Sequence, residues 1–144
     1  PLRFVPKGKT VKGQVANIDF APTLLDAAKT KAGRKMDGVS LLPTAKNPKR
    51  RPNRAFEIEA LSPLFIGPIP NNAWDRPYKG VRTDRYTYVL WTETGELELY
   101  DRKADPYELD NAAGDPAYAT VQARLARKAE KLRDCAGRDC DVRP

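Results

Sequence analysis

The sequence contains no histidine, and only two of its 144 residues are cysteines. Without histidine the chain cannot form a Ser-His-Asp or Cys-His catalytic arrangement, and it lacks the commonest zinc ligand. Two cysteines are also too few for a closed zinc site, which needs four ligands. We therefore do not expect this chain to have an enzymatic activity of its own.

Long apolar runs are missing as well. No uninterrupted stretch approaches the roughly 20 apolar residues that a membrane-spanning helix needs, and no leader pattern opens the chain. The first residue is Pro1 rather than Met, as in a fragment or a processed product. We expect a soluble protein without a membrane span, and 144 residues with 40% hydrophobic content suit one compact domain, residues 1–144.

Acidic residues are outnumbered by basic ones. The chain has 26 Lys and Arg residues against 19 Asp and Glu residues, which gives a net charge of +7. The basic residues form small groups, at residues 7–12, at residues 46–54 and along the last predicted helix. Solubility is the simpler explanation of this charge, and an anionic partner is the other.

The two cysteines lie close together near the end of the sequence. Four residues separate Cys135 from Cys140, and Gly137 between them can make the turn that closes such a loop. We predict a disulfide, with two free thiols on a frayed tail as the alternative. Because cytosolic thiols generally stay reduced, a disulfide would indicate an exported protein that is periplasmic, secreted or at the cell surface.

Hydrophobic periodicity predicts helices in the first third of the chain and a strand after them. A helix begins at an N-cap residue, Asp19, and runs to about Lys29. Its apolar face consists of Phe20, Leu24, Leu25 and Ala28. Residues 40–45 form a turn of helix at most. Residues 54–61 alternate as a half-buried strand does, with Phe56, Ile58 and Ala60 on one side and Glu57 and Glu59 on the other.

Turn residues and a final helix complete the pattern. Residues 62–77 are rich in Pro and Asn and form a loop, and strands follow over 78–82, 85–91 and 96–101. Asp115 before Pro116 begins an amphipathic helix that ends near Arg133. The predicted fold class is α+β: a small antiparallel sheet of about four strands packs against a long C-terminal amphipathic helix, with a shorter N-terminal helix.

The most informative stretch is ELYDRKADPYELDN, residues 98–111, which leads from a predicted strand through an acidic turn towards the last helix. Its side chains can cap and turn the backbone, but they offer no nucleophile beside a base. The pattern resembles the late signature of type I sulfatases, the sulfuric ester hydrolases of the alkaline-phosphatase-like superfamily, such as arylsulfatases and N-acetylglucosamine-6-sulfatases. Three more segments are similar to that family in the same order: VANIDFAPTLL (15–25), MDGVSLL (36–42) and GVRTDRYTY (80–88).

The resemblance extends from about Pro1 to Cys140 and implies the C-terminal subdomain of a sulfatase. Residues 1–53 would connect it to the catalytic domain, and residues 54–144 would form the sheet and its helix. In the family the nucleophile is a formylglycine made from the Cys or Ser of a Cys/Ser-x-Pro-x-Arg motif, and neither Cys135 nor Cys140 lies in such a motif. We expect no catalytic residue, metal or cofactor in this chain, and we expect formylglycine and calcium in the missing N-terminal domain.

The same resemblance implies a supporting role. The chain would be inactive alone, would stabilise the catalytic domain of the same polypeptide and would border the pocket for a sulfate ester. The interface left by that domain could also drive self-association. Candidate substrate-binding residues, in or just after the long loop, are Trp74, Tyr78, Lys79 and Arg82, because aromatic rings and cations suit a sugar or aryl sulfate ester. Alternatively, these residues only cover the edge of the sheet.

Two acidic clusters have simpler explanations than a site. Asp105, Glu108, Asp110 and Asn111 lack the spacing of an EF-hand calcium loop and can cap the helix or bond the amides of their own turn. Glu57 and Glu59 share one strand face, but a general acid and base also need a cleft, so we expect a solvated face.

A second hypothesis is an autonomous basic module that binds sulfated polysaccharide or nucleic acid, suggested by the charge of +7 with interleaved aromatic residues. The sequence has no RRM aromatic signature, KH glycine loop or zinc finger. Nucleic acid is therefore the less favoured ligand of such a module.

Overall fold

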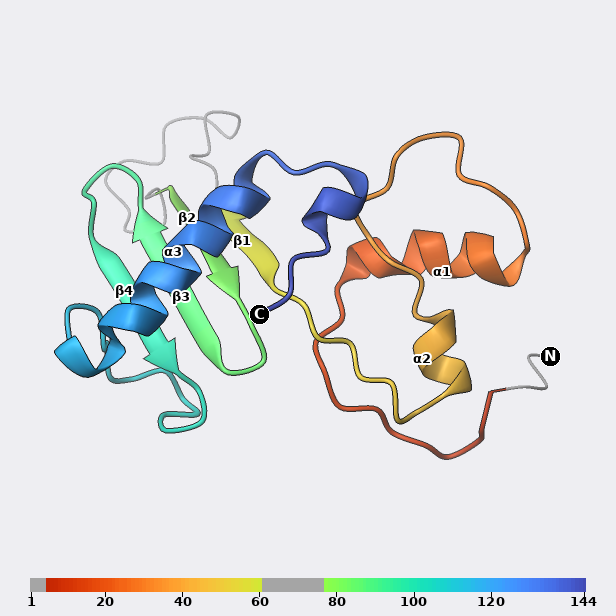
Figure 1. Cartoon of the computed structure of the whole chain (residues 1–144), viewed down its shortest axis with the longest axis horizontal. Helices are drawn as coiled ribbons and strands as arrows, with labels where there is room; N and C mark the ends of the chain where they lie inside the picture. Colours follow the sequence, from red (N-terminus) through yellow and green to blue (C-terminus); the bar gives the residue numbers. More distant parts are fainter. Residues whose placement is uncertain (1–4, 61–76) are drawn as a thin grey trace, which may run out of the picture.

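The computed structural model describes residues 5–60 and 77–144, and it has two parts that lie side by side (Figure 1). One part holds the short helices of the N-terminal third: η1 (Asn17–Asp19), α1 (Phe20–Ala27) and α2 (Leu42–Lys46). The other is a four-stranded sheet covered by α3 (Ala119–Arg133). The predicted α+β fold, with a sheet of about four strands and two helices of different length, is confirmed.

The sheet is an antiparallel meander in the order β1-β2-β3-β4. Its strands are β1 (Phe56–Ala60), β2 (Tyr78–Arg82), β3 (Tyr86–Trp91) and β4 (Leu97–Asp101). Thr83 closes the turn between β2 and β3, because its amide donates to the Tyr86 carbonyl at 2.8 Å and its hydroxyl oxygen accepts the Tyr86 amide at 2.8 Å. Gly80 allows β2 and β3 to approach, since a Cβ there would lie 2.1 Å from the Tyr88 carbonyl oxygen.

The hydrophobic core lies between the sheet and α3. The register aligns Val81, Tyr88 and Leu99 across three strands on one face, and α3 covers this face with Leu125 and Leu132. Val81, Leu99 and Leu125 are completely buried. Each such side chain contributes about 1.5–3 kcal/mol through burial, so this interface accounts for much of the stability. The helix begins after η3 (Pro116–Tyr118), which Asp115 caps by accepting the Ala117 amide at 2.8 Å.

The faces of β1 differ from the prediction. Glu57 pairs with Val81 across the strands, so Glu57 lies on the face that α3 covers, whereas Phe56 and Ile58 lie on the open face. The expectation that Glu57 and Glu59 form a solvated face is therefore wrong for Glu57, which is half-buried. Alternation alone shows that two faces differ, but the position of α3 decides which one is covered.

The N-terminal part also departs from its predicted details. Helix α1 ends at Ala27 rather than at about Lys29, and Lys29 has a left-handed backbone (φ 55°) beyond the helix C-cap. The side chain of Asp19 does not cap α1. The predicted apolar face is not buried in this chain, because Phe20 is 63% and Leu24 is 70% exposed.

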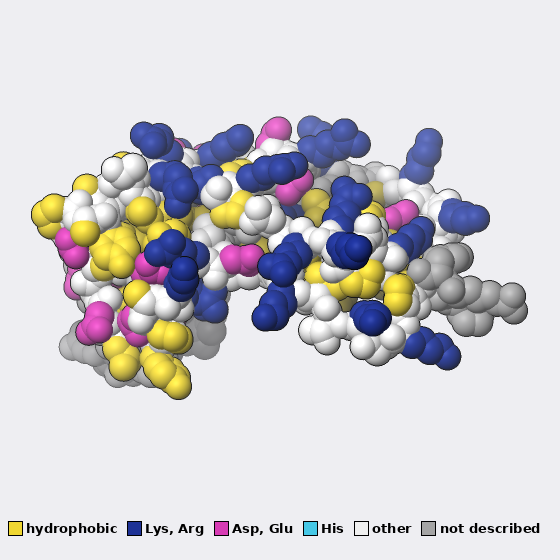
Figure 2. All heavy atoms as spheres, turned by 60° about the horizontal axis from the view of Figure 1, so that its bottom comes forward, with side chains coloured by type: hydrophobic (Ala, Val, Ile, Leu, Met, Phe, Trp, Pro, Cys, Tyr) yellow, Lys and Arg dark blue, Asp and Glu magenta, His cyan; other side chains and the backbone are white. Residues whose placement is uncertain are grey.

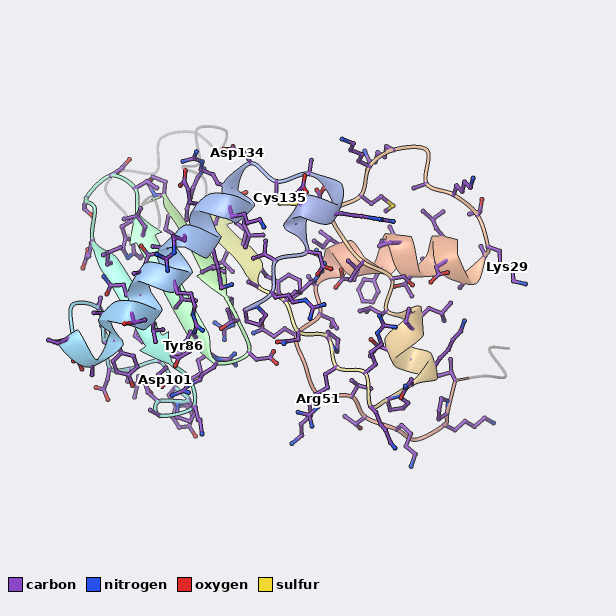
Figure 3. The ribbon with its side chains drawn as sticks, viewed as in Figure 1. Lys29, Arg51, Tyr86, Asp101, Asp134 and Cys135 are labelled. Atoms are coloured by element: carbon purple, nitrogen blue, oxygen red, sulfur yellow. A yellow bond between two sulfur atoms is a disulfide. The ribbon has the colours of Figure 1, made fainter. Side chains whose placement is uncertain are left out.

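The C-terminal segment lies between these two parts and contacts both of them (Figure 1). The predicted disulfide joins Cys135 to Cys140, across η4 (Gly137–Cys140). The Gly137 amide donates to Asp37 Oδ1 at 2.6 Å, and the Ala55 amide donates to the Val142 carbonyl at 2.7 Å. Figure 3 shows Cys135 at the end of α3, far from Lys29 at the outer end of the N-terminal part. Within the described ranges 5–60 and 77–144, no helix is long and apolar enough to cross a membrane.

Candidate functional site

The predicted substrate-binding residues are distributed over both faces of β2. Tyr78 and Arg82 lie on the open face: the Tyr78 ring packs edge-on against Trp91 at 5.3 Å, and Arg82 donates to the hydroxyl of Thr87 at 3.1 Å. Lys79 lies on the opposite face and lines a small hollow beneath α3. Trp74 lies outside the described residues. The structure thus brings Tyr78 and Arg82 to one face and separates Lys79 from them.

Arg82 belongs to a network that reaches the signature turn. Its guanidinium lies 3.2 Å from Glu108 Oε1, and Arg102 approaches the same oxygen at 3.4 Å from the other side. The Thr87 hydroxyl also donates to Glu108 at 2.5 Å. Glu108 itself has a left-handed backbone (φ 57°). The turn imposes this conformation, which costs free energy in a residue other than glycine. The open face therefore carries two guanidinium groups held by one half-buried carboxylate.

The remaining polar residues of the signature bond the protein itself. Asp105 Oδ2 accepts the amides of Leu109 and Asp110 at 2.6 and 2.9 Å. Asn111 joins the turn to β4, since its oxygen accepts the Leu99 amide at 3.0 Å and its nitrogen donates to the Leu97 carbonyl at 3.0 Å. These bonds support the structural explanation of the acidic turn over a calcium loop.

The last residue of ELYD, Asp101, forms an ion pair with Arg85. Arg85 binds Asp101 through two parallel hydrogen bonds of 2.9 and 2.7 Å, at the end of the sheet where Figure 3 labels Tyr86 and Asp101. The bonds from Arg85 lower the pKa of Asp101 to about 2, although burial alone would raise that pKa. Tyr118 also donates to Asp101 at 3.3 Å, which ties the start of α3 to β4.

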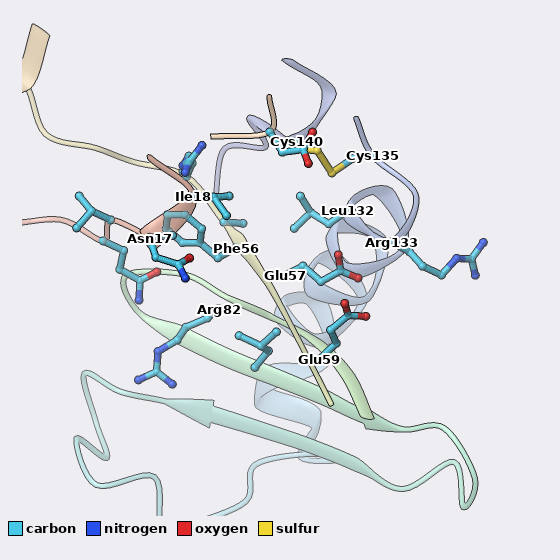
Figure 4. Close-up of a pocket in the computed structure, with 17 residues that line it drawn as sticks. Asn17, Ile18, Phe56, Glu57, Glu59, Arg82, Leu132, Arg133, Cys135 and Cys140 are labelled. Atoms are coloured by element: carbon cyan, nitrogen blue, oxygen red, sulfur yellow. A yellow bond between two sulfur atoms is a disulfide. The ribbon is translucent and has the colours of Figure 1, made fainter. Parts of the chain in front are cut away.

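A groove of about 670 Å³ runs between the N-terminal segment, β1 and the end of α3 (Figure 4). On one side lie Asn17, Ile18 and Phe56, and on the other lie Leu132 and the disulfide. Glu57 and Glu59 lie on the α3 side of β1. Burial first, and Glu59 second, raise the pKa of Glu57. The residues that line the groove include no Ser, Thr, Tyr, Lys or His, and its two cysteines are bonded to each other, so Glu57 and Glu59 have no hydroxyl, thiol or amine beside them there.

A buried ion pair at the groove joins the two parts. Arg54 contacts Asp19, with side chains 5% and 1% exposed. Asp19 also accepts the amides of Ala16 and Val39, both at 3.0 Å. Sequence reasoning missed this pair because 35 positions separate its members. A lone aspartate in an apolar segment and an arginine before a strand were the only signals for it.

Exposed apolar side chains gather in two places. In the part of the chain that the structure describes, the large hydrophobic residues with high exposure are Val15, Ile18, Phe20, Leu24, Tyr107 and Leu109. The first four lie on the N-terminal segment and α1, and the last two lie in the signature turn. Lys and Arg side chains, by contrast, are spread over both parts of the molecule (Figure 2). Clustered exposed apolar residues are typical of an interaction surface.

Metal ligands are not assembled in the described residues. These contain no group of three or more His, Cys, Asp or Glu side chains that could hold a metal ion. Both cysteines are bonded to each other.

The comparisons with known proteins agree on one family. Residues 1–135 match the family described as N-sulphoglucosamine sulphohydrolase, C-terminal. The chain is 34% identical over 125 residues to a ulvan-active sulfatase of Formosa agariphila. The aligned residues make up 87% of this chain and 23% of that protein.

Solved structures contain the same unit. One, a protein in complex with its substrate D-glucosamine-2-N,6-O-disulfate, is 28% identical with a TM-score of 0.75, over 90% of this chain and 26% of that one. Another, a phosphonate monoester hydrolase of Agrobacterium radiobacter, is 29% identical with a TM-score of 0.60, over 80% of this chain and 24% of that one. The chain thus spans about a quarter of the length of these relatives. It belongs to the N-sulphoglucosamine sulphohydrolase C-terminal family and is a C-terminal sulfatase domain of the alkaline-phosphatase-like superfamily.

Proposed function

We propose that this chain is the non-catalytic partner of a sulfatase catalytic domain in one polypeptide, which it stabilises and whose substrate pocket it borders. Alone it hydrolyses no ester. The parent protein cleaves sulfate esters with a formylglycine and calcium that its N-terminal domain supplies. The disulfide supports export of the parent protein to an oxidising compartment.

The observation that carries this proposal is the apolar face of the N-terminal part. Phe20 and Leu24 project from α1 with 63% and 70% of their surface exposed, and Val15 and Ile18, which precede the helix, are 54% and 48% exposed. A helix of this kind is normally stabilised by burying its apolar side, and among residues 5–60 and 77–144 nothing buries Phe20 or Leu24. The catalytic domain is the cover that the family relationship supplies.

The open face of the sheet is the side that we assign to the substrate pocket. Arg82 and Arg102 there form ion pairs with Glu108, and such cations suit a sulfated ligand. Tyr78 and Trp91 give the same face an aromatic edge suited to a sugar ring. Lys79, on the opposite face, is not part of this assignment. Trp74 stays a prediction from the sequence.

The relatives support a proposal for the substrate class. One relative is named a ulvan-active sulfatase, and another was solved in complex with its substrate D-glucosamine-2-N,6-O-disulfate, which is a sulfated sugar. We infer a sulfated carbohydrate as the substrate of the parent protein. The phosphonate monoester hydrolase supports a second candidate, a parent that cleaves phosphonate monoesters.

The test uses the purified chain and its full-length parent, each with calcium, on an aryl sulfate and an aryl phosphonate monoester. We expect the full-length parent to release sulfate and the chain alone to release none. Faster release from the phosphonate by the parent would favour the second candidate. Sulfate release by the chain alone would overturn the proposal.

A further inference from the structure

A strip of positive charge follows one side of α3. Arg124, Arg127, Lys128 and Lys131 are spaced three and four residues apart, so they lie on one side of the helix over two turns. With Arg143 from the end of the chain, these four residues line a hollow of about 480 Å³. We call these five residues the α3 basic trough. The spacing was visible in the sequence, but the contribution of Arg143 was not.

The C-terminal segment gives the trough a fixed wall. Val142 is 6% exposed, and its carbonyl accepts the Ala55 amide at 2.7 Å beside the sheet. The next carbonyl, that of Arg143, accepts a hydrogen bond from Lys128 Nζ. The tail is therefore held against α3 by both apolar burial and hydrogen bonds, which makes the hollow a feature of the folded chain.

Positive charge exceeds negative charge among the residues that line this hollow, with five cations against Asp141. Among residues 5–60 and 77–144, no acid forms an ion pair with Arg124, Arg127 or Lys131, although Asp141 lines the same hollow. Burial first, and then Arg124 and Lys131, lower the pKa of Lys128. Arg133 on the same helix differs, because it pairs with Glu130 at 2.9 Å and Asp134 at 3.0 Å. An anion in the trough would relieve repulsion that these like charges create.

The trough is suited neither to docking on the catalytic domain nor to binding nucleic acid. Val142 is its single apolar side chain and is buried, whereas the exposed apolar residues lie elsewhere, on the N-terminal segment and the signature turn. No aromatic side chain lines the trough, and Tyr86, which Arg124 approaches at 5.9 Å, is 8% exposed. Proteins that hold single-stranded nucleic acids usually stack bases on exposed aromatic rings.

We propose that the α3 basic trough binds a sulfated segment of a polysaccharide, at a site separate from the reacting ester. This proposal rests on the proposed function, because it assigns a polymeric substrate to the same protein. Three guanidinium groups can each bind two oxygens of a sulfate group, and two ammonium groups add charge. The trough would hold the polymer while the open face of the sheet receives its reacting unit.

The test compares two variants of the chain with equal charge. Arg127→Gln/Lys131→Gln removes two exposed cations of the trough, and Lys7→Gln/Lys9→Gln removes two exposed cations elsewhere. The probes are heparin, unsulfated alginate and single-stranded DNA, and titration calorimetry over a series of salt concentrations gives the affinities. We expect the trough variant to bind heparin about tenfold more weakly, with a salt slope reduced by about 2, while the control stays within about twofold.

Equal losses of heparin affinity in the two variants would overturn the proposal, because they would show that heparin binding depends on net charge alone. Tighter binding of DNA than of heparin would also overturn it in favour of nucleic acid. Amide exchange provides a check that needs no variant: heparin should protect residues 124–131 of the unsubstituted chain. These readouts need no catalysis, so a parent protein without sulfatase activity would refute the proposed function and leave this test intact.

Discussion

The N-terminal part, residues 5–53, and the sheet with α3 are stabilised by different interactions. The sheet has a continuous core in which Val81, Leu99 and Leu125 are fully buried. In the N-terminal part, Leu42 is the one buried hydrophobic residue, and the most buried side chain there is the charged Asp19. One part is organised by its own apolar packing, and the other by polar contacts to its neighbour.

This difference explains how a domain can be both folded and incomplete. The sheet and α3 bury their apolar faces on each other and so share a continuous core. Helix α1 leaves Phe20 and Leu24 exposed, and Asp19 and Arg54 hold it near the sheet. We therefore expect substitutions in the sheet to change the stability of the chain. Substitutions on α1 should instead change the stability and activity of the parent protein.

The largest expected effect is in the core. Leu125→Ala should lower the free energy of unfolding by about 3–5 kcal/mol, because the side chain is fully buried and its removal leaves a cavity. Urea unfolding followed by circular dichroism measures the change. Leu125→Met is the matched control and should cost less than about 1.5 kcal/mol. If Leu125→Ala lowers the free energy of unfolding by less than about 1 kcal/mol, the packing of Leu125 against the sheet does not have a central role in stability.

A smaller and local effect is expected at the buried ion pair. Asp19→Ala leaves Arg54 buried without its partner and frees the amides of Ala16 and Val39, which should cost about 3 kcal/mol. Hydrogen exchange should show faster exchange of these two amides, with unchanged protection in β2 and β3. Asp26→Ala, an exposed acid of the same part, serves as the control. Uniform loss of protection in both variants would mean that the two parts unfold as one.

The smallest effect on stability is expected from pH. Arg85 holds the pKa of Asp101 at about 2 in the folded chain, below its ordinary value of 3.8. A lowered pKa stabilises the folded state above pH 3.8, and this contribution is lost as the pH falls through 2. Because Arg85 is 51% exposed, solvent screening reduces the effect to about 1–2 kcal/mol.

The measurement compares the chain with Asp101→Asn in urea unfolding at a series of pH values. The unsubstituted chain should be the more stable of the two near neutral pH. That advantage should decline between about pH 4 and pH 2. An advantage that stays constant over this range would show that the ion pair is not its source.

Sequence patterns predicted the sheet well because its signals are local. Alternating residues marked the strands over 54–61, 78–82, 85–91 and 96–101, and Asp115 marked the start of the last helix. The separation of Lys79 from Arg82 was also available, because an odd spacing places two strand residues on opposite faces.

Contacts between distant parts of the chain could not be predicted in this way. The open face of β1 contains the half-buried Phe56 and Ile58, which looked like core residues because the position of α3 was unknown. Asp19 looked like a helix cap because its partner, Arg54, lies far away in the sequence. The apolar side of α1 looked buried because the pattern does not say which protein part covers it.

The most direct test of the account replaces the exposed face of α1 in two settings. Phe20→Ser/Leu24→Ser should change the unfolding free energy of the chain by less than about 0.5 kcal/mol, because both side chains are already in water. In the full-length parent protein the same pair should lower the melting temperature and the rate of sulfate release. An unchanged parent protein would contradict the claim that this face docks on the catalytic domain.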